Sequence, residues 1–124
     1  MVIGFAAGLV CYWASVVAKN KLGYDDSLDV FGVHGVGGIL GTILAGVFAT
    51  RLINDVNKGQ PVGLVDGNGG QVLTQLYGVV AVGIFCGVVT WIILKIVDAM
   101  VGLRATRDEE VEGLDTALHG ERVQ

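Results

Sequence analysis

Residues 30–50 read VFGVHGVGGILGTILAGVFAT, a run of 21 residues that contains no Asp, Glu, Lys or Arg. A helix rises about 1.5 Å per residue, so about 20 apolar residues cross the hydrocarbon core of a bilayer. The length of the run therefore predicts a membrane-spanning helix. Six of its residues are Gly, and its one ionisable side chain is His34.

Two further uncharged runs flank this one, at residues 1–18 and 72–94, with 18 and 23 residues. The whole chain of 124 residues is 52% hydrophobic and 16% charged, whereas soluble domains average about 25% charged. A signal peptide is an alternative for the first run, but MVIGF at its start lacks a basic segment. These features predict an all-α membrane protein with three transmembrane helices.

The expected organisation is one transmembrane domain followed by a polar tail. We expect the domain at residues 1–103, its helices at about 1–18, 26–50 and 72–101, and the tail at 104–124. Five Lys and Arg residues lie in the first connection or after the third helix (Lys19, Lys21, Lys95, Arg104 and Arg107), and two lie in the second connection (Arg51 and Lys58). Because cytoplasmic loops are enriched in Lys and Arg, we expect the first connection and the tail on the cytoplasmic side.

The remaining composition argues against several other classes of protein. No basic stripe with interleaved aromatic side chains is present, so we expect no nucleic-acid partner. Cys11 and Cys86 lie inside apolar runs without Cys-x-x-Cys spacing, and no His, Cys or carboxylate stands three or four residues from His34. The sequence therefore predicts no metal site and no cofactor, and it gives no disulfide framework.

His34 shares one face of its helix with Gly37, Gly38 and Gly41, because residues three, four and seven positions apart lie on the same side. Small residues let membrane helices approach closely, so we expect this face to pack against protein. An imidazole within a membrane is costly without a partner and titrates near neutral pH, which makes His34 a candidate for proton handling. A hydrogen bond that serves packing alone is the alternative.

Acidic residues precede this helix in the segment DDSLD at residues 25–29. Asp and Ser accept hydrogen bonds from free N–H groups at a helix N-terminus, and negative charge is favoured there. We expect Asp26 or Ser27 to cap the helix and Asp29 to lie in its first turn. Attraction of cations to the mouth of a pore is the alternative.

The string DDSLDVFGVHGVGGILGTILAGVFAT at residues 25–50 resembles the penultimate transmembrane helix of the ammonium transporter family of Amt, Mep and Rh proteins. Further segments resemble the same family: Tyr12-Trp13, KLGY at 21–24, IILK at 92–95, GLR at 102–104, EGLD at 112–115 and HGE at 119–121. The resemblance covers nearly the whole chain, but only the last quarter or third of a family member. We therefore expect the chain to be the C-terminal part of a longer transporter.

The resemblance implies a homotrimer in which eleven helices of each subunit enclose a hydrophobic pore. Ammonium would lose a proton at the outer face, and ammonia would pass between two facing histidines. His34 matches the second of them, with Val30 and Phe31 nearby. The tail would influence gating, with a signalling protein of the PII type as partner; its matching residues are Arg104, Glu112, Gly113, Leu114 and Asp115.

The first pore histidine and the outer recruitment site belong to earlier helices of the family, so we expect this chain not to transport ammonium alone. A small membrane protein that assembles with a complete transporter is an alternative. An enzyme is a further alternative, but it would need a nucleophile, base or metal group beyond His34 and the distant His119. We expect no enzymatic activity.

Overall fold

The computed structural model describes residues 1–53 and 58–120, and the regular elements within these ranges are all helical. Three helical spans are long and apolar enough to cross a membrane: Val2–Leu22, Phe31–Phe48 and Gly70–Val101. They confirm the predicted all-α membrane architecture. The chain divides into two compact units, residues 1–83 and 84–124, which are described separately below.

The first span consists of α1 (Val2–Tyr12), a π-helical segment (Trp13–Ala18) and α2 (Lys19–Leu22). It continues four residues beyond the expected end at residue 18, because long Lys side chains extend their charge to the polar boundary from a helix end. Gly23 then ends the helix in the left-handed conformation, with φ +66°. Its N–H donates to the Lys19 carbonyl oxygen at 2.8 Å.

The second span consists of a π-helical segment (Phe31–Gly35) followed by α3 (Val36–Phe48). It begins about five residues later than the expected start near residue 26. The reason is the backbone of Asp29, whose φ of +54° lies in the left-handed region and interrupts a right-handed helix. Residues 26–29 therefore form a turn that leads into the span.

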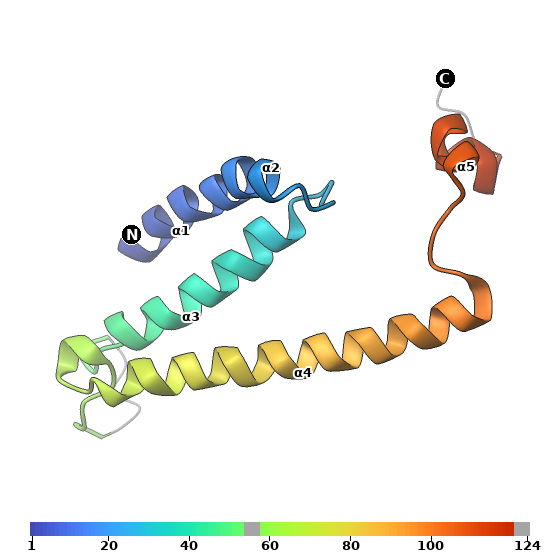
Figure 1. The fold of residues 1–124 in the computed structure, drawn as a ribbon. Coiled ribbons are helices and arrows are strands. Elements are labelled where there is room, and N and C mark those ends of the chain that lie inside the picture. The colour runs from blue at the N-terminus through green and yellow to red at the C-terminus, as the bar shows by residue number, and fades with distance from the viewer. Residues whose placement is uncertain (54–57, 121–124) are drawn as a thin grey trace. The chain divides into compact units, whose positions relative to one another are not determined.

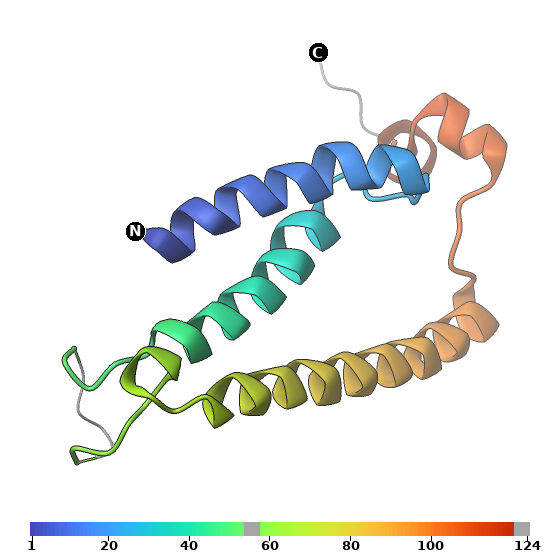
Figure 2. The ribbon, with the colours of Figure 1, turned by 60° about the vertical axis from the view of Figure 1, so that its left-hand side comes forward.

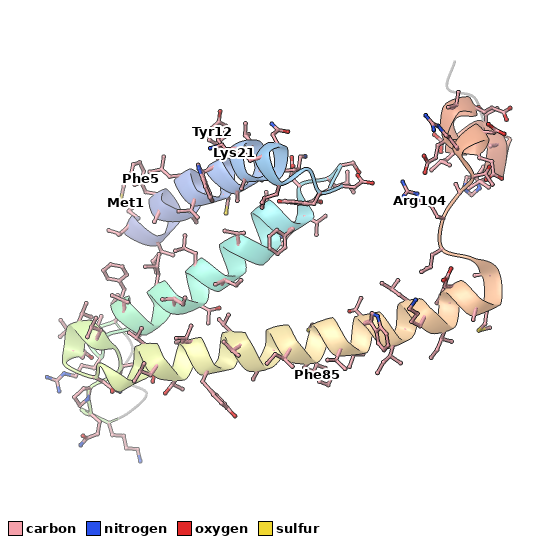
Figure 3. The ribbon with its side chains drawn as sticks, in the orientation of Figure 1. Met1, Phe5, Tyr12, Lys21, Phe85 and Arg104 are labelled. Atoms are coloured by element: carbon pink, nitrogen blue, oxygen red, sulfur yellow. The ribbon has the colours of Figure 1, made fainter. Side chains whose placement is uncertain are left out.

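The first two spans lie side by side in the first unit (Figures 1 and 2). Small side chains make this approach possible: a Cβ at Gly32 would lie 2.4 Å from Ser15 Oγ, and a Cβ at Gly37 would lie 2.9 Å from Cys11 Sγ. Ala14 is the one buried hydrophobic side chain among the described residues. Tyr12 projects away from α3 (Figure 3).

The third span is the single helix α4 (Gly70–Val101), whose 32 residues correspond to about 48 Å. Its start packs on α3, where a Cβ at Gly46 would lie 2.7 Å from Gln75 Cγ. Gly102, with φ +78°, ends the helix. Residues of α4 from 84 onward belong to the second unit.

The tail folds into the short helix α5 (Arg107–Glu112) and a π-helical turn (Asp115–His119). Thr106 and Glu109 form a capping box at the start of α5, in which each side chain binds the backbone N–H of the other residue. The sequence left open whether this segment is ordered.

Large apolar side chains of all three spans are exposed in the structure, for example Phe5, Val33 and Phe85. A soluble protein would bury such a surface. The exposed surface must therefore be covered by lipid or by further helices.

Candidate functional site

The candidate site lies at the start of the second span, around His34. His34 is part of the π-helical segment Phe31–Gly35, its side chain is exposed, and it is the one ionisable residue of the span. Added Cβ atoms at Gly38 and Gly41 would meet nothing within 4 Å. The side of the helix that carries these two glycines is therefore open in this chain.

Gly37 differs from the other two glycines that were expected to pack with it, because it faces Cys11 in α1. The sequence prediction placed all three glycines and His34 on one face of a regular α-helix. The structure has a wide π-helical turn through His34, which changes the angular relation between this residue and α3. Among the three, only Gly37 has a packing neighbour within 4 Å of an added Cβ.

Val30 precedes the same turn, Phe31 is its first residue, and both are exposed. The Phe31 ring meets the Tyr24 ring edge-on, with centroids 5.8 Å apart and planes at 87°. It also lies so close to Gly35 that a Cβ there would be 3.0 Å from the Phe31 ring. Phe31 is therefore held against its own turn and the preceding connection.

Two aspartates organise the first connection. Both carboxylate oxygens of Asp26 accept backbone hydrogen bonds, from Val30 N at 2.8 Å and from Phe31 N at 2.9 Å. The Asp29 carbonyl oxygen accepts from Val33 N at 2.9 Å. Asp26 thus binds the first free N–H groups of the helix, although it lies five residues before Phe31, where the helix begins.

Lys19 joins this turn to the first span. Its ammonium group forms an ion pair with the Asp29 carboxylate and donates to the Asp26 carbonyl oxygen at 2.9 Å. In the sequence, Lys19 was informative only about membrane orientation. A contact over ten residues between a helix end and a loop has no local sequence pattern, so the residue types alone did not reveal it.

A third carboxylate, Asp66, organises the opposite end of α3. It accepts hydrogen bonds from Thr50 Oγ1 at 2.7 Å, Arg51 N at 2.8 Å and Val62 N at 3.3 Å. The Arg51 N–H and then the Thr50 hydroxyl hold the pKa of Asp66 below its ordinary value of 3.8. Sequence reasoning did not single out Asp66 either.

The tail residues singled out from the sequence lie in the second unit. Arg104 lies between α4 and α5 (Figure 3), and its Nε is 3.2 Å from the Glu110 carboxylate. Glu112 ends α5, Gly113 follows with φ +98°, and Leu114 and Asp115 lead into the last turn. Within residues 1–53 and 58–120, no three His, Cys, Asp or Glu side chains form a group that could hold a metal ion.

Comparison with known proteins places these features in a family. The profile of the Ammonium Transporter Family matches residues 1–124. An ammonium transporter of Aquifex aeolicus is 48% identical over 121 residues, which cover 98% of this chain and 27% of that protein. An ammonium transporter of Bacillus subtilis is 42% identical over 123 residues, which cover 99% of this chain and 30% of that protein. Ammonium transporter 1 of Dictyostelium discoideum is 42% identical over 119 residues, which cover 96% of this chain and 25% of that protein.

The chain therefore spans between 25% and 30% of the length of these three relatives. The family profile matches the chain from its first residue to its last, and the helices it matches are apolar enough to lie in a membrane. The chain belongs to the ammonium transporter family.

Proposed function

We propose that the chain contributes to an ammonium-conducting pore and that His34 lies on the surface of this pore. The observation that carries the proposal is the position of His34. It is the one ionisable side chain in the second span, and it is exposed on a helix whose Gly38 and Gly41 border open space. An ionisable side chain in a membrane span indicates a functional site by default, and a substrate path is one such site.

The chemistry of the site suits ammonia better than a metal cation. A neutral imidazole offers one hydrogen-bond donor and one acceptor, which match the groups of ammonia. Val30 and Phe31 beside it are apolar and replace none of the water around Na⁺ or K⁺. Hydrated alkali cations would therefore be excluded from a passage of this kind.

Three spans leave much of their apolar surface exposed, so the pore requires further helices. We propose that these are supplied by the remainder of a transporter subunit, including the helix with the second pore histidine, and that subunits form a trimer in a plasma or inner membrane. The tail, with Arg104 and residues 112–115, would then lie in the cytoplasm and contact a neighbouring subunit and a PII-type protein. The open side of α3 at Gly38 and Gly41 is available to such helices.

A chimera tests this proposal. The aligned 30% of the Bacillus subtilis relative is replaced by this chain, and uptake of radiolabelled methylammonium is measured in bacteria without other ammonium transporters. The chimera should take up the probe. The substitution His34→Ala should lower uptake about tenfold or more, which corresponds to about 1.4 kcal/mol in the barrier.

Two controls accompany the chimera. The substitution His119→Ala changes the other histidine of the chain and should leave uptake unchanged. The 124-residue chain expressed alone should show no uptake. Equal uptake by the His34→Ala and unmodified chimeras, at equal amounts in the membrane, would refute the assignment of His34.

A further inference from the structure

Lys19 connects the end of the first span to the turn that precedes His34. We propose that Lys19 is a positioning residue for His34: its contacts with Asp29 and Asp26 fix where the second helix begins and how His34 is oriented. The role of His34 in conduction rests on the function proposed above. The positioning itself is a property of the chain that can be measured separately.

The contacts of Lys19 are more shielded than those of a typical surface ion pair. The side chains of Lys19 and Asp29 are 24% and 40% exposed, whereas those of Arg104 and Glu110 in the tail are 80% and 44% exposed. Lys19 also donates to the Asp26 carbonyl oxygen. Charges that are partly removed from water interact more strongly, so the Lys19 contacts are able to hold the turn in place.

The two partners of Lys19 bind the backbone of the first helical turn. Asp26 accepts from the N–H groups of Val30 and Phe31, and the Asp29 carbonyl accepts from that of Val33. Asp26 and Asp29 are also joined to each other, because Asp29 N donates to the Asp26 carbonyl oxygen at 3.2 Å. Three of the four N–H groups directly before His34 are therefore held by residues that Lys19 contacts.

The backbone of Asp29 explains why an external contact is needed. Its φ of +54° is a conformation that residues other than Gly adopt rarely, Asp and Asn more readily than the rest, and that is retained when the surroundings support it. The Lys19 ion pair is the described side-chain contact of Asp29. Without it, Asp29 is free to return to a right-handed or extended conformation, and the wide turn that contains His34 changes.

Lys21 provides a matched control on the same short helix, α2. It is two residues from Lys19, its side chain is exposed, and none of the hydrogen bonds or ion pairs described for the chain involves it. If Lys19 served only to hold the helix end at the membrane surface, Lys21 would be its equivalent. A positioning role predicts that the two residues differ in their effect on His34.

The experiment uses the 124-residue chain with ¹⁵N-labelled histidine, in nanodiscs of phosphatidylcholine and phosphatidylglycerol at one fixed pH. The chain has two histidines, His34 and His119, and the variant His119→Gln assigns their NMR signals. We expect Lys19→Met to shift the ring signals of His34 and to leave those of His119 in place. Lys21→Met should shift neither set, and Lys19→Arg should restore the His34 signals because it retains the ion pair.

One outcome would contradict the proposed positioning of His34 by Lys19. If the His34 signals are the same in Lys19→Met and Lys21→Met, Lys19 does not position His34. Should Lys19→Met fail to fold, as judged by circular dichroism, Asp29→Asn removes the charge from the other partner while its side chain tolerates the left-handed conformation. None of these NMR and circular dichroism measurements depends on transport. A chimera that fails to conduct would therefore refute the proposed function without affecting this inference.

Discussion

The two ends of the second span are both organised by an aspartate, but in different ways. At the N-terminal end, Asp26 accepts hydrogen bonds from Val30 N and Phe31 N. At the C-terminal end, Asp66 accepts from the side chain of Thr50 and from the backbone of Arg51 and Val62. The first carboxylate serves the helix itself, whereas the second joins two distant parts of a loop.

The difference follows from the groups that a helix leaves free. An N-terminus presents free N–H groups, which a carboxylate can bind directly. A C-terminus presents carbonyl oxygens, which a carboxylate cannot bind. Asp66 therefore binds the loop beyond α3, and at the helix end itself Gly63 closely approaches the carbonyl groups.

The largest expected effect concerns this close approach. A Cβ at Gly63 would lie 2.5 Å from the Ala49 carbonyl oxygen and 2.8 Å from that of Gly46. Because both atoms belong to the backbone, Gly63→Ala must displace the loop, and we expect it to lower the free energy of unfolding by roughly 1–3 kcal/mol. Unfolding by sodium dodecyl sulfate, followed by circular dichroism in detergent micelles, measures the change.

Gly69→Ala in the same loop is the control for this prediction. Its added Cβ would lie 3.7 Å from Leu64 Cδ1, which is an ordinary contact. The control should change the free energy of unfolding by less than about 0.5 kcal/mol. Equal stabilities of the two variants would show that the C-terminal end of α3 does not depend on Gly63.

A smaller effect is expected at the N-terminal end. Asp26→Ala removes the acceptor of two helix N–H groups, and loss of an N-cap of this type costs about 1 kcal/mol. The neighbouring Asp25 is exposed, and its side chain makes no hydrogen bond described for the chain, so Asp25→Ala should be nearly neutral. Hydrogen exchange provides the measurement: the amides of Val30 and Phe31 should lose protection in Asp26→Ala alone.

Much of the fold was predictable because the signals are local. Long uncharged runs indicate three spans, and the part of the chain that the structure describes contains three helices that are long and apolar enough to cross a membrane. The helix ends were less predictable. The first span continues through Lys19 and Lys21 to Gly23, and the second starts only after Asp29, whose left-handed backbone no simple pattern indicates.

The site was predictable to a smaller degree. A single ionisable residue in an apolar run identifies His34 as the residue of interest, and its role in conduction stays a prediction. The π-helical turn around it lies beside contacts with another part of the chain, namely Lys19 with Asp29 and Gly32 with Ser15. These contacts depend on the folded chain, so the pattern of one helix does not indicate the π-helical turn, and the packing of Gly38 and Gly41 stays a prediction.

The smallest effect is a dependence of the Asp66 loop on pH. Hydrogen bonds from Arg51 N and the Thr50 hydroxyl lower the pKa of Asp66 in the folded loop below its ordinary value of 3.8. A lowered pKa means that Asp66 contributes its full stabilisation above the ordinary value and loses it as the pH falls through the folded value. The NMR signal of the Arg51 amide should therefore stay constant from pH 7 to about 5 and change below about 4. In Asp66→Asn the same signal should not titrate, whereas an unchanged titration in that variant would assign the effect to another group and leave Asp66 without its role in the loop.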